Sequence, residues 1–257
     1  MRIVVKVGTS TLAHATGQLN IRRIERLCRV IADIKNSGVE VVMVSSGAIG
    51  MGVGKLSLPE RPRDVPGKQA ASAVGQCELM YVYDKEFEQY HHVVAQMLLT
   101  SYEIENDGCR RNIENTLQRL MDYRVLPIVN ENDTVATEEL GIGENDTLSA
   151  IVATLAKADL LVILSDIDGL YDSDPHQNPQ ARLIPLVEEI TPETFALAGG
   201  AGSRLGTGGM ETKLRAGLVA NRAGIPMVIM NGRQPELLYD LMEGKPVGTR
   251  FEGRKSV

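Results

Sequence analysis

The sequence predicts an α/β fold, a three-layer α/β/α sandwich with a mostly parallel open sheet. Short runs of β-branched residues alternate with amphipathic helical stretches along the chain. Several of these runs are apolar at every position, as expected for strands that are buried on both faces. We find no internal repeat and no low-complexity linker, so we expect a single domain over residues 1–257.

The predicted strands are short and rich in Val, Ile and Leu. In chain order they cover residues 2–6, 40–45, 93–98, 125–129, 159–164 and 226–230. The predicted helices carry apolar residues at helical spacing; in the first of them Ile24, Leu27 and Ile31 share one face, and Gly38 follows its end. In chain order the helical segments cover residues 21–35, 67–90, 110–121, 146–157, 210–223 and 235–242.

Composition narrows the class of protein. The net charge of -6 argues against a general nucleic-acid binder, which needs clustered Lys and Arg. No apolar run approaches the roughly 18 residues that span a bilayer, and the apolar stretch at the N-terminus is too short for a signal peptide. We therefore expect a cytoplasmic protein with no membrane partner. The 3 cysteines and 4 histidines show no disulfide or metal-ligand spacing.

Polar residues and glycines follow the predicted strands. The segments are 7–10 (VGTS), 45–48 (SSGA), 130–133 (NEND), 165–166 (SD) and 231–232 (NG). In open α/β sheets, ligands bind beyond the carboxyl ends of the strands. We therefore expect the functional site at this edge of the sheet.

Two of these turns and two lysines indicate phosphate chemistry. VGTS and SSGA could be ordinary strand-to-helix turns, but glycines and free amides at a helix start also favour anions. Lys6 ends the first strand, and Lys213 is the last residue of a glycine-rich stretch, LGTGGMETK (205–213). Its register does not fit the phosphate loop G-x-x-x-x-G-K-[ST], because Thr212 precedes the lysine. Two lysines from different elements could neutralise charge on a transferring phosphoryl group.

The acidic stretch 130–146 supplies further candidates. Asn145 opens an amphipathic helix and could be either its N-cap or a binding residue. Asp146 could orient lysine side chains or complement the helix dipole. Asp133, in the loop after the strand, could hold an ammonium group.

Six motifs together resemble the amino acid kinase family, and within it the glutamate 5-kinase branch. They are VVKVGTS (4–10), VSSGAIGMG (44–52), PIVNENDTVA (127–136), GENDTLSA (143–150), LSDIDGLY (164–171) and LGTGGMETK (205–213). The resemblance implies the fold of that family and the reaction ATP + L-glutamate → ADP + L-glutamyl 5-phosphate, the first step of proline biosynthesis. It also implies magnesium as cofactor. Other acyl-phosphate kinases of the fold, for N-acetylglutamate or carbamate, stay open as alternatives, as does a non-catalytic nucleotide-binding protein.

The resemblance assigns roles residue by residue. Lys6 and Lys213 would stabilise the transferring phosphoryl group, and Asp146 would organise the two lysines. Ser46, Asp133 and Asn145 match the family's glutamate-binding positions. The ATP-binding positions are Lys6, Ser165, Asp166, Thr207, Gly208, Gly209, Met210, Glu211, Thr212 and Lys213.

The resemblance also bears on regulation and assembly. Members of this branch are commonly inhibited by proline, which we expect to compete with glutamate, and we expect a homo-oligomer, a dimer or a tetramer. Many members carry a C-terminal PUA domain, which we do not expect in this chain. Glu144 stands where the family often has aspartate, so a magnesium role for it does not follow from the resemblance.

Overall fold

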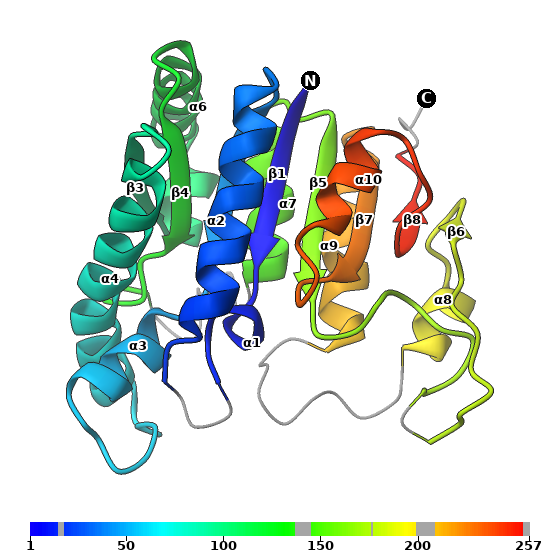
Figure 1. Ribbon diagram of the computed structural model, residues 1–257, viewed down its shortest axis with the longest axis horizontal. Coiled ribbons are helices and arrows are strands. Elements are labelled where there is room, and N and C mark those ends of the chain that lie inside the picture. The colour runs from blue at the N-terminus through cyan, green and yellow to red at the C-terminus, as the bar shows by residue number, and fades with distance from the viewer. Residues whose placement is uncertain (15–17, 137–144, 176, 199–208, 254–257) are drawn as a thin grey trace.

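An eight-stranded sheet forms the centre of the molecule in the computed structural model (Figure 1). The structure describes residues 1–14, 18–136, 145–175, 177–198 and 209–253. Across the sheet the strands follow the order β3-β4-β2-β1-β5-β7-β8-β6. The strands are β1 (Arg2–Val7), β2 (Glu40–Ser45), β3 (Val94–Leu99), β4 (Leu126–Glu131), β5 (Leu160–Ser165), β6 (Leu186–Val187), β7 (Met227–Asn231) and β8 (Thr249–Phe251).

Helices cover both faces of this sheet. They are α1 (Thr9–Leu12), α2 (Ile21–Asn36), α3 (Ala48–Lys55), α4 (Val65–Glu88), α5 (Ser101–Glu105), α6 (Asp107–Asp122), α7 (Asn145–Leu155), α8 (Pro192–Leu197), α9 (Met210–Arg222) and α10 (Leu237–Met242). In Figure 1, α2 and α10 lie in front of the strands, and α7 and α9 lie behind them. None of the helices in the described parts of the chain is long and apolar enough to cross a membrane.

Two hydrophobic cores follow from the alternation of side chains along the strands. In β1, Ile3 and Val5 pack in one core with α2, α4 and α10. Val4 belongs to the other core, which α6, α7 and α9 cover. Because successive side chains of a strand point to opposite faces, Lys6 lies on the same face as Val4, next to α7.

The predicted fold class is confirmed, with differences confined to short elements. All the pairings between neighbouring strands are parallel except that of β7 with β8, which is antiparallel. The sequence did not predict β6 and β8, nor the helices α1, α3, α5 and α8, which have eight residues or fewer. Elements of this length depend on tertiary contacts more than on their own periodicity. The buried hydroxyl of Thr249 in β8 illustrates this, because it accepts a hydrogen bond from the amide of Leu170 at 2.8 Å.

Helices α3 and α4 pack against each other at glycines. A Cβ atom on Gly52 would lie 1.7 Å from the carbonyl oxygen of Ala71, and one on Gly75 would lie 1.8 Å from that of Ala48. Only glycine permits such close contact between the two backbones. This contact fixes α4 beside the start of α3, which directly follows the carboxyl end of β2.

Candidate active site

Lys6, Asp146 and Lys213 form a buried cluster of three charges at the carboxyl edge of the sheet. Nζ of Lys6 lies 2.6 Å from Oδ1 of Asp146, and Nζ of Lys213 lies 3.2 Å from Oδ2 of the same carboxylate. The Thr212 hydroxyl donates to Oδ2 at 2.8 Å. Both carboxylate oxygens are thus engaged, and the cluster carries an excess of one positive charge.

Three elements position this cluster. Lys6 comes from the carboxyl end of β1, and Asp146 from the first turn of α7, which packs on β1 and on α9. Lys213 belongs to the first turn of α9, which begins directly after Gly209. Residues far apart in sequence therefore meet because β1, α7 and α9 are neighbours. The structure thus brings together the three residues that the sequence singled out for phosphoryl transfer.

Asp146 is held in its ionised form. Its burial, with 1% of the side chain exposed, would by itself raise the pKa. The positive charges of Lys6 and Lys213, together with hydrogen bonds from Lys6 and Thr212, outweigh this effect, so the pKa of Asp146 is lowered. A carboxylate that stays ionised keeps both ammonium groups in a fixed position.

A second cluster next to the charged one consists of neutral side chains. Nδ2 of Asn145 donates to Oγ of Ser46 at 2.8 Å and to Oδ1 of Asn130 at 2.9 Å. Asn145 thus joins the carboxyl ends of β2 and β4 to the start of α7. Its Oδ1 is buried and has no hydrogen-bond partner among the described residues, so it does not act as a helix N-cap. A buried acceptor without a donor is suited to a ligand N–H group.

Asp133 lies in the loop that follows β4 and is partly buried against α4. The Ser72 hydroxyl of α4 donates to Oδ2 of Asp133 at 2.6 Å. Burial raises the pKa of Asp133, although the hydrogen bond from Ser72 and the charge of Arg61 both act to lower it. A cation at this carboxylate would compensate for the cost of burying its charge.

Comparison with known proteins identifies the family. The model of the "Amino acid kinase family" matches residues 1–231. The chain belongs to the amino acid kinase family. It is 55% identical to a protein named glutamate 5-kinase of Clostridium perfringens, with 99% of this chain and 96% of the relative covered. It is 51% identical to the glutamate 5-kinase of Listeria innocua, with 99% and 94% covered.

Solved structures with low identity share the fold of this amino acid kinase. A carbamate kinase from Giardia lamblia bound to AMP-PNP superposes with a TM-score of 0.70 at 17% identity, covering 98% of each chain. An isopentenyl phosphate kinase of T. acidophilum in a product complex superposes with a TM-score of 0.68 at 18% identity, covering 98% of this chain and all of the other. At such identity the likeness establishes the fold alone.

The remaining predicted ATP-binding residues of the kinase are placed only in part. Ser165 and Asp166 lie at and just after the end of β5, the strand beside β1, and the Ser165 hydroxyl donates to Asp166 at 3.3 Å. Met210 packs on the core, and Glu211 pairs with Arg215 one turn later at 2.7 Å. Thr207 and Gly208 lie outside the described residues.

Sequence reasoning missed the contribution of α4 to this site. Ser72 and Gln76, both buried, bond to Asp133 and Asn130 respectively. Their spacing of four residues places them on one face of the helix. The signal that could have indicated this contribution is the presence of polar residues at helical spacing within an otherwise well-packed helix.

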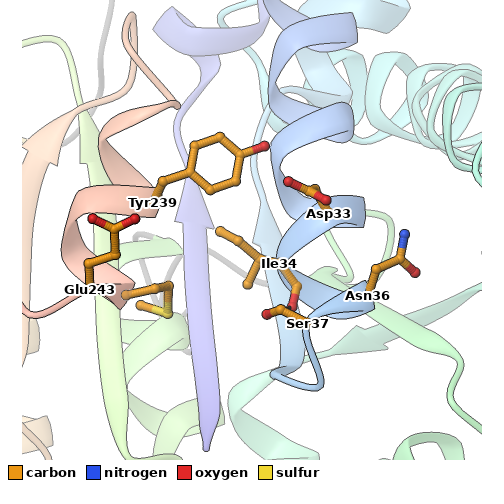
Figure 2. A pocket seen from close by; sticks show the side chains of 7 residues that line it. Asp33, Ile34, Asn36, Ser37, Tyr239 and Glu243 are labelled. Atoms are coloured by element: carbon orange, nitrogen blue, oxygen red, sulfur yellow. Dashed lines mark hydrogen bonds between the residues drawn. The ribbon is translucent and has the colours of Figure 1, made fainter.

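A surface pocket of about 460 Å³ lies elsewhere and contains none of the predicted site residues (Figure 2). It is formed between the last turn of α2 and α10, and the Tyr239 hydroxyl faces Asp33 across it. Because α2 runs back from the carboxyl edge of the sheet to the start of β2, this pocket lies at the opposite edge from the charged cluster.

Proposed function

We propose that this chain is a glutamate 5-kinase, which transfers the γ-phosphoryl group of ATP to the side-chain carboxylate of L-glutamate and thereby performs the first step of proline biosynthesis. The carrying observation is the buried Asp146 between Lys6 and Lys213. The identity of 50–55% to several proteins named glutamate 5-kinase, over nearly the whole chain, supports this substrate.

The reaction needs charge neutralisation and alignment more than proton transfer. The glutamate side chain has a pKa of about 4.3, so it is already a carboxylate at neutral pH and requires no general base. One of its oxygens forms a bond to the γ-phosphorus, while the bond from that phosphorus to the oxygen bridging the β- and γ-phosphates breaks. The electron pair of the broken bond remains on ADP. Negative charge accumulates on the transferring group and on the leaving oxygen.

Lys6 and Lys213 supply the opposing charge. Their ammonium groups contact different oxygens of the Asp146 carboxylate, so they can contact different oxygens of the phosphates. Because Asp146 holds them before ATP binds, little reorganisation is needed during the reaction, and this preorganisation is the main source of electrostatic catalysis. Asp146 itself is a positioning residue in this scheme.

Magnesium fits the site as a companion of ATP. Mg²⁺ usually keeps several waters and binds through substrate phosphates with one or two carboxylates. Among the described residues no group of three or more His, Cys, Asp or Glu side chains could hold a metal ion by itself. Of the two carboxylates in the predicted ATP site, Glu211 is paired with Arg215, and Asp166, directly after β5, could contribute to such a set. The ion would reduce the negative charge of the phosphates that Lys6 and Lys213 contact.

The neutral cluster and Asp133 are suited to the amino-acid end of glutamate. The Oδ1 atom of Asn145 and the carboxylate of Asp133 are acceptors that an α-ammonium group could satisfy. Ser46, held by Asn145, presents a hydroxyl at the end of β2. We assign Ser46, Asp133 and Asn145 to glutamate binding.

Trapping of the acyl phosphate tests the proposal. The purified protein is incubated with MgATP, hydroxylamine and one of four substrates: L-glutamate, N-acetylglutamate, aspartate or carbamate. Hydroxylamine attacks an acyl phosphate and gives a stable hydroxamate with release of phosphate. We expect hydroxamate from glutamate alone. Hydroxamate from N-acetylglutamate but not from glutamate would contradict the assignment, as would ATP binding without any product.

We further propose that proline inhibits this enzyme by competing with glutamate. Proline carries an α-amino group and an α-carboxylate like those of glutamate, and a site built around Asp133 and Asn145 could accept both. Proline should therefore raise the KM for glutamate and leave kcat at saturating glutamate unchanged. The measurement is a proline titration at several glutamate concentrations. Inhibition that persists undiminished at saturating glutamate would rule out a shared site.

A further inference from the structure

Four polar side chains on one face of α4 bond to the ends of β2 and β4 and to the loop after β4. They are Gln69, Ser72, Gln76 and Tyr83, which contact Ala136, Asp133, Asn130 and Ser45, respectively. Gln76 differs from the others in one respect. Its Nε2 is buried and has no hydrogen-bond partner among the described residues, although its Oε1 accepts a hydrogen bond.

A backbone amide fixes the direction of the hydrogen bonds around Gln76. The N–H of Glu131 donates to the side chain of Asn130 at 2.9 Å, so the atom that receives it must be Oδ1. The other end of the Asn130 amide is therefore Nδ2, a donor, and it bonds to Gln76 at 2.8 Å. Gln76 has to present its oxygen to this donor. The orientation of both amides thus follows from chemistry.

The same reasoning extends to Asn145. Oδ1 of Asn130 also takes a hydrogen bond from Asn145 at 2.9 Å, which requires Asn145 to present Nδ2 on that side. The Ser46 hydroxyl oxygen accepts from the same Nδ2 at 2.8 Å. Oδ1 of Asn145 is consequently the atom left for a ligand. The hydrogen bonds run in one direction, from Asn145 through Asn130 to Gln76.

We propose that Gln76 is a positioning residue for glutamate: by accepting from Asn130 it holds the amide chain in the orientation in which Asn145 offers an acceptor to the substrate's α-ammonium group. The inference rests on the proposed function. If Asn130 lost this acceptor, its buried NH2 group would have no partner, and a turn toward another acceptor would draw its Oδ1 away from the Glu131 amide and from Asn145. Asn145 would then lose the acceptor that keeps its Nδ2 away from the substrate. A donor facing the ammonium group would repel it.

The first test replaces Gln76 by methionine, which has a similar volume and accepts only weakly. We expect Gln76→Met to weaken glutamate binding by roughly tenfold, measured by calorimetry without ATP, while the KM for ATP changes by less than about twofold. Gln69→Met is the matched control, because it makes the same change on the same face of α4 but touches neither amide. If Gln69→Met weakens glutamate as strongly as Gln76→Met, general disturbance of α4 explains the effect and the proposal is wrong.

The second test asks whether Gln76 acts through Asn145. In an Asn145→Ala background there is no amide left to orient, so adding Gln76→Met should change glutamate affinity by less than about twofold. A further tenfold loss in the double variant would overturn the proposal. Gln76→Glu gives a check that does not depend on the methionine variant folding, because its carboxyl oxygen can still accept from Asn130. Glutamate affinity close to that of the wild type supports the proposal, and a loss as large as that of Gln76→Met would overturn it by assigning the role to Nε2.

These measurements separate the inference from the proposed function. If the unaltered protein binds no glutamate in the calorimeter and gives no hydroxamate from it, the proposed function has failed. If the unaltered protein does both and Gln76→Met binds glutamate equally well, only the role of Gln76 has failed.

Discussion

The two halves of the candidate site differ in chemistry and in how completely their polar groups are paired. In the half that would handle phosphate, Lys6, Asp146 and Lys213 form close ion pairs that involve both oxygens of the carboxylate. In the half that would handle glutamate, neutral amides predominate, and both ends of the amide chain, Asn145 Oδ1 and Gln76 Nε2, have no partner among the described residues.

This difference separates catalysis from recognition. The charged half has its geometry fixed before any ligand arrives, which suits a reaction step in which charge develops quickly. The neutral half leaves hydrogen-bonding capacity that only a matching ligand can satisfy, and a ligand that lacks the matching group leaves a buried atom unpaired. We therefore expect changes in the charged half to act on kcat and changes in the neutral half to act on the KM for glutamate.

The largest effect is expected at Lys213. Lys213→Ala removes one of the two positive charges near the transferring phosphoryl group, so kcat should fall by a factor on the order of 10² or more, with little change in the KM for glutamate. Steady-state kinetics with both substrates varied measures this. Lys245→Ala is the control, because Lys245 is a surface lysine paired with Asp240 at 2.8 Å. An unchanged kcat in Lys213→Ala would mean that Lys213 only forms a structural ion pair with Asp146 and does not act on the phosphoryl group.

Asp133 should show the opposite pattern. Asp133→Ala removes a carboxylate that would contact the α-ammonium group in the ground state and in the transition state alike, so the KM for glutamate should rise by roughly tenfold or more. The KM for ATP and kcat at saturation should stay within about twofold of their original values. Equal effects on the two substrates would argue that Asp133 supports the loop and has no contact with glutamate.

Much of the fold could be predicted from the sequence because the long elements show strong periodicity. The helix predicted at 21–35 is observed as Ile21–Asn36, and the strand predicted at 40–45 is observed as Glu40–Ser45. The antiparallel pairing of β7 with β8 was not predicted, because β8 has only three residues and no alternating pattern. Its position depends on contacts such as that of Thr249 with Leu170, in the segment that follows β5.

Candidate site residues could be predicted where a charged or polar side chain lies at the carboxyl end of a predicted strand or at the start of a predicted helix. Lys6 and Asp146 could be singled out because Lys6 lies near the carboxyl end of β1 and Asp146 lies in the first turn of α7, and their roles stay predictions. The contribution of Gln76 could not be found in this way, because it lies in the middle of a helix and its role depends on a tertiary contact with Asn130. Sequence periodicity shows which side chains share a face, but it does not show which strand that face meets.

The contact between α3 and α4 offers a way to disturb the neutral half alone. In Gly75→Ala the new methyl group would lie 1.8 Å from the carbonyl oxygen of Ala48, so the helices must move apart. We expect a loss of roughly 2–3 kcal/mol in the free energy of unfolding, measured by urea denaturation. Displacement of α4 should also raise the KM for glutamate by about fivefold and leave the KM for ATP almost unchanged.

Gly50→Ala is the matched control for this variant. The nearest atom to a Cβ on Gly50 is 3.9 Å away, in the side chain of Thr9, so the methyl group fits. Alanine is the better helix former, and stability should be unchanged or rise by up to about 1 kcal/mol. If Gly75→Ala proves as stable as Gly50→Ala, the backbones of α3 and α4 do not pack as closely at Gly75 as described.

A further effect is expected in the pH dependence, which should differ between the two halves. Burial raises the pKa of Asp133 above its ordinary value of 3.8, whereas the neighbouring lysines lower that of Asp146. As the pH falls, Asp133 therefore takes up a proton first, and its neutral form no longer attracts an ammonium group. The KM for glutamate should rise by up to about tenfold for each pH unit below the pKa of Asp133, while the KM for ATP stays level because Asp146 remains ionised.

The control for the pH profile is Asp133→Asn, which has no proton to take up. Its KM for glutamate should be high at every pH and should lack the rise that Asp133 causes. The substrate's own side-chain carboxyl also takes up a proton near a pH of about 4.3, so the difference between the two profiles carries the test. A rise of the same size in both proteins would mean that Asp133 does not titrate in contact with glutamate. Asp133 would then have to be removed from the residues assigned to glutamate recognition.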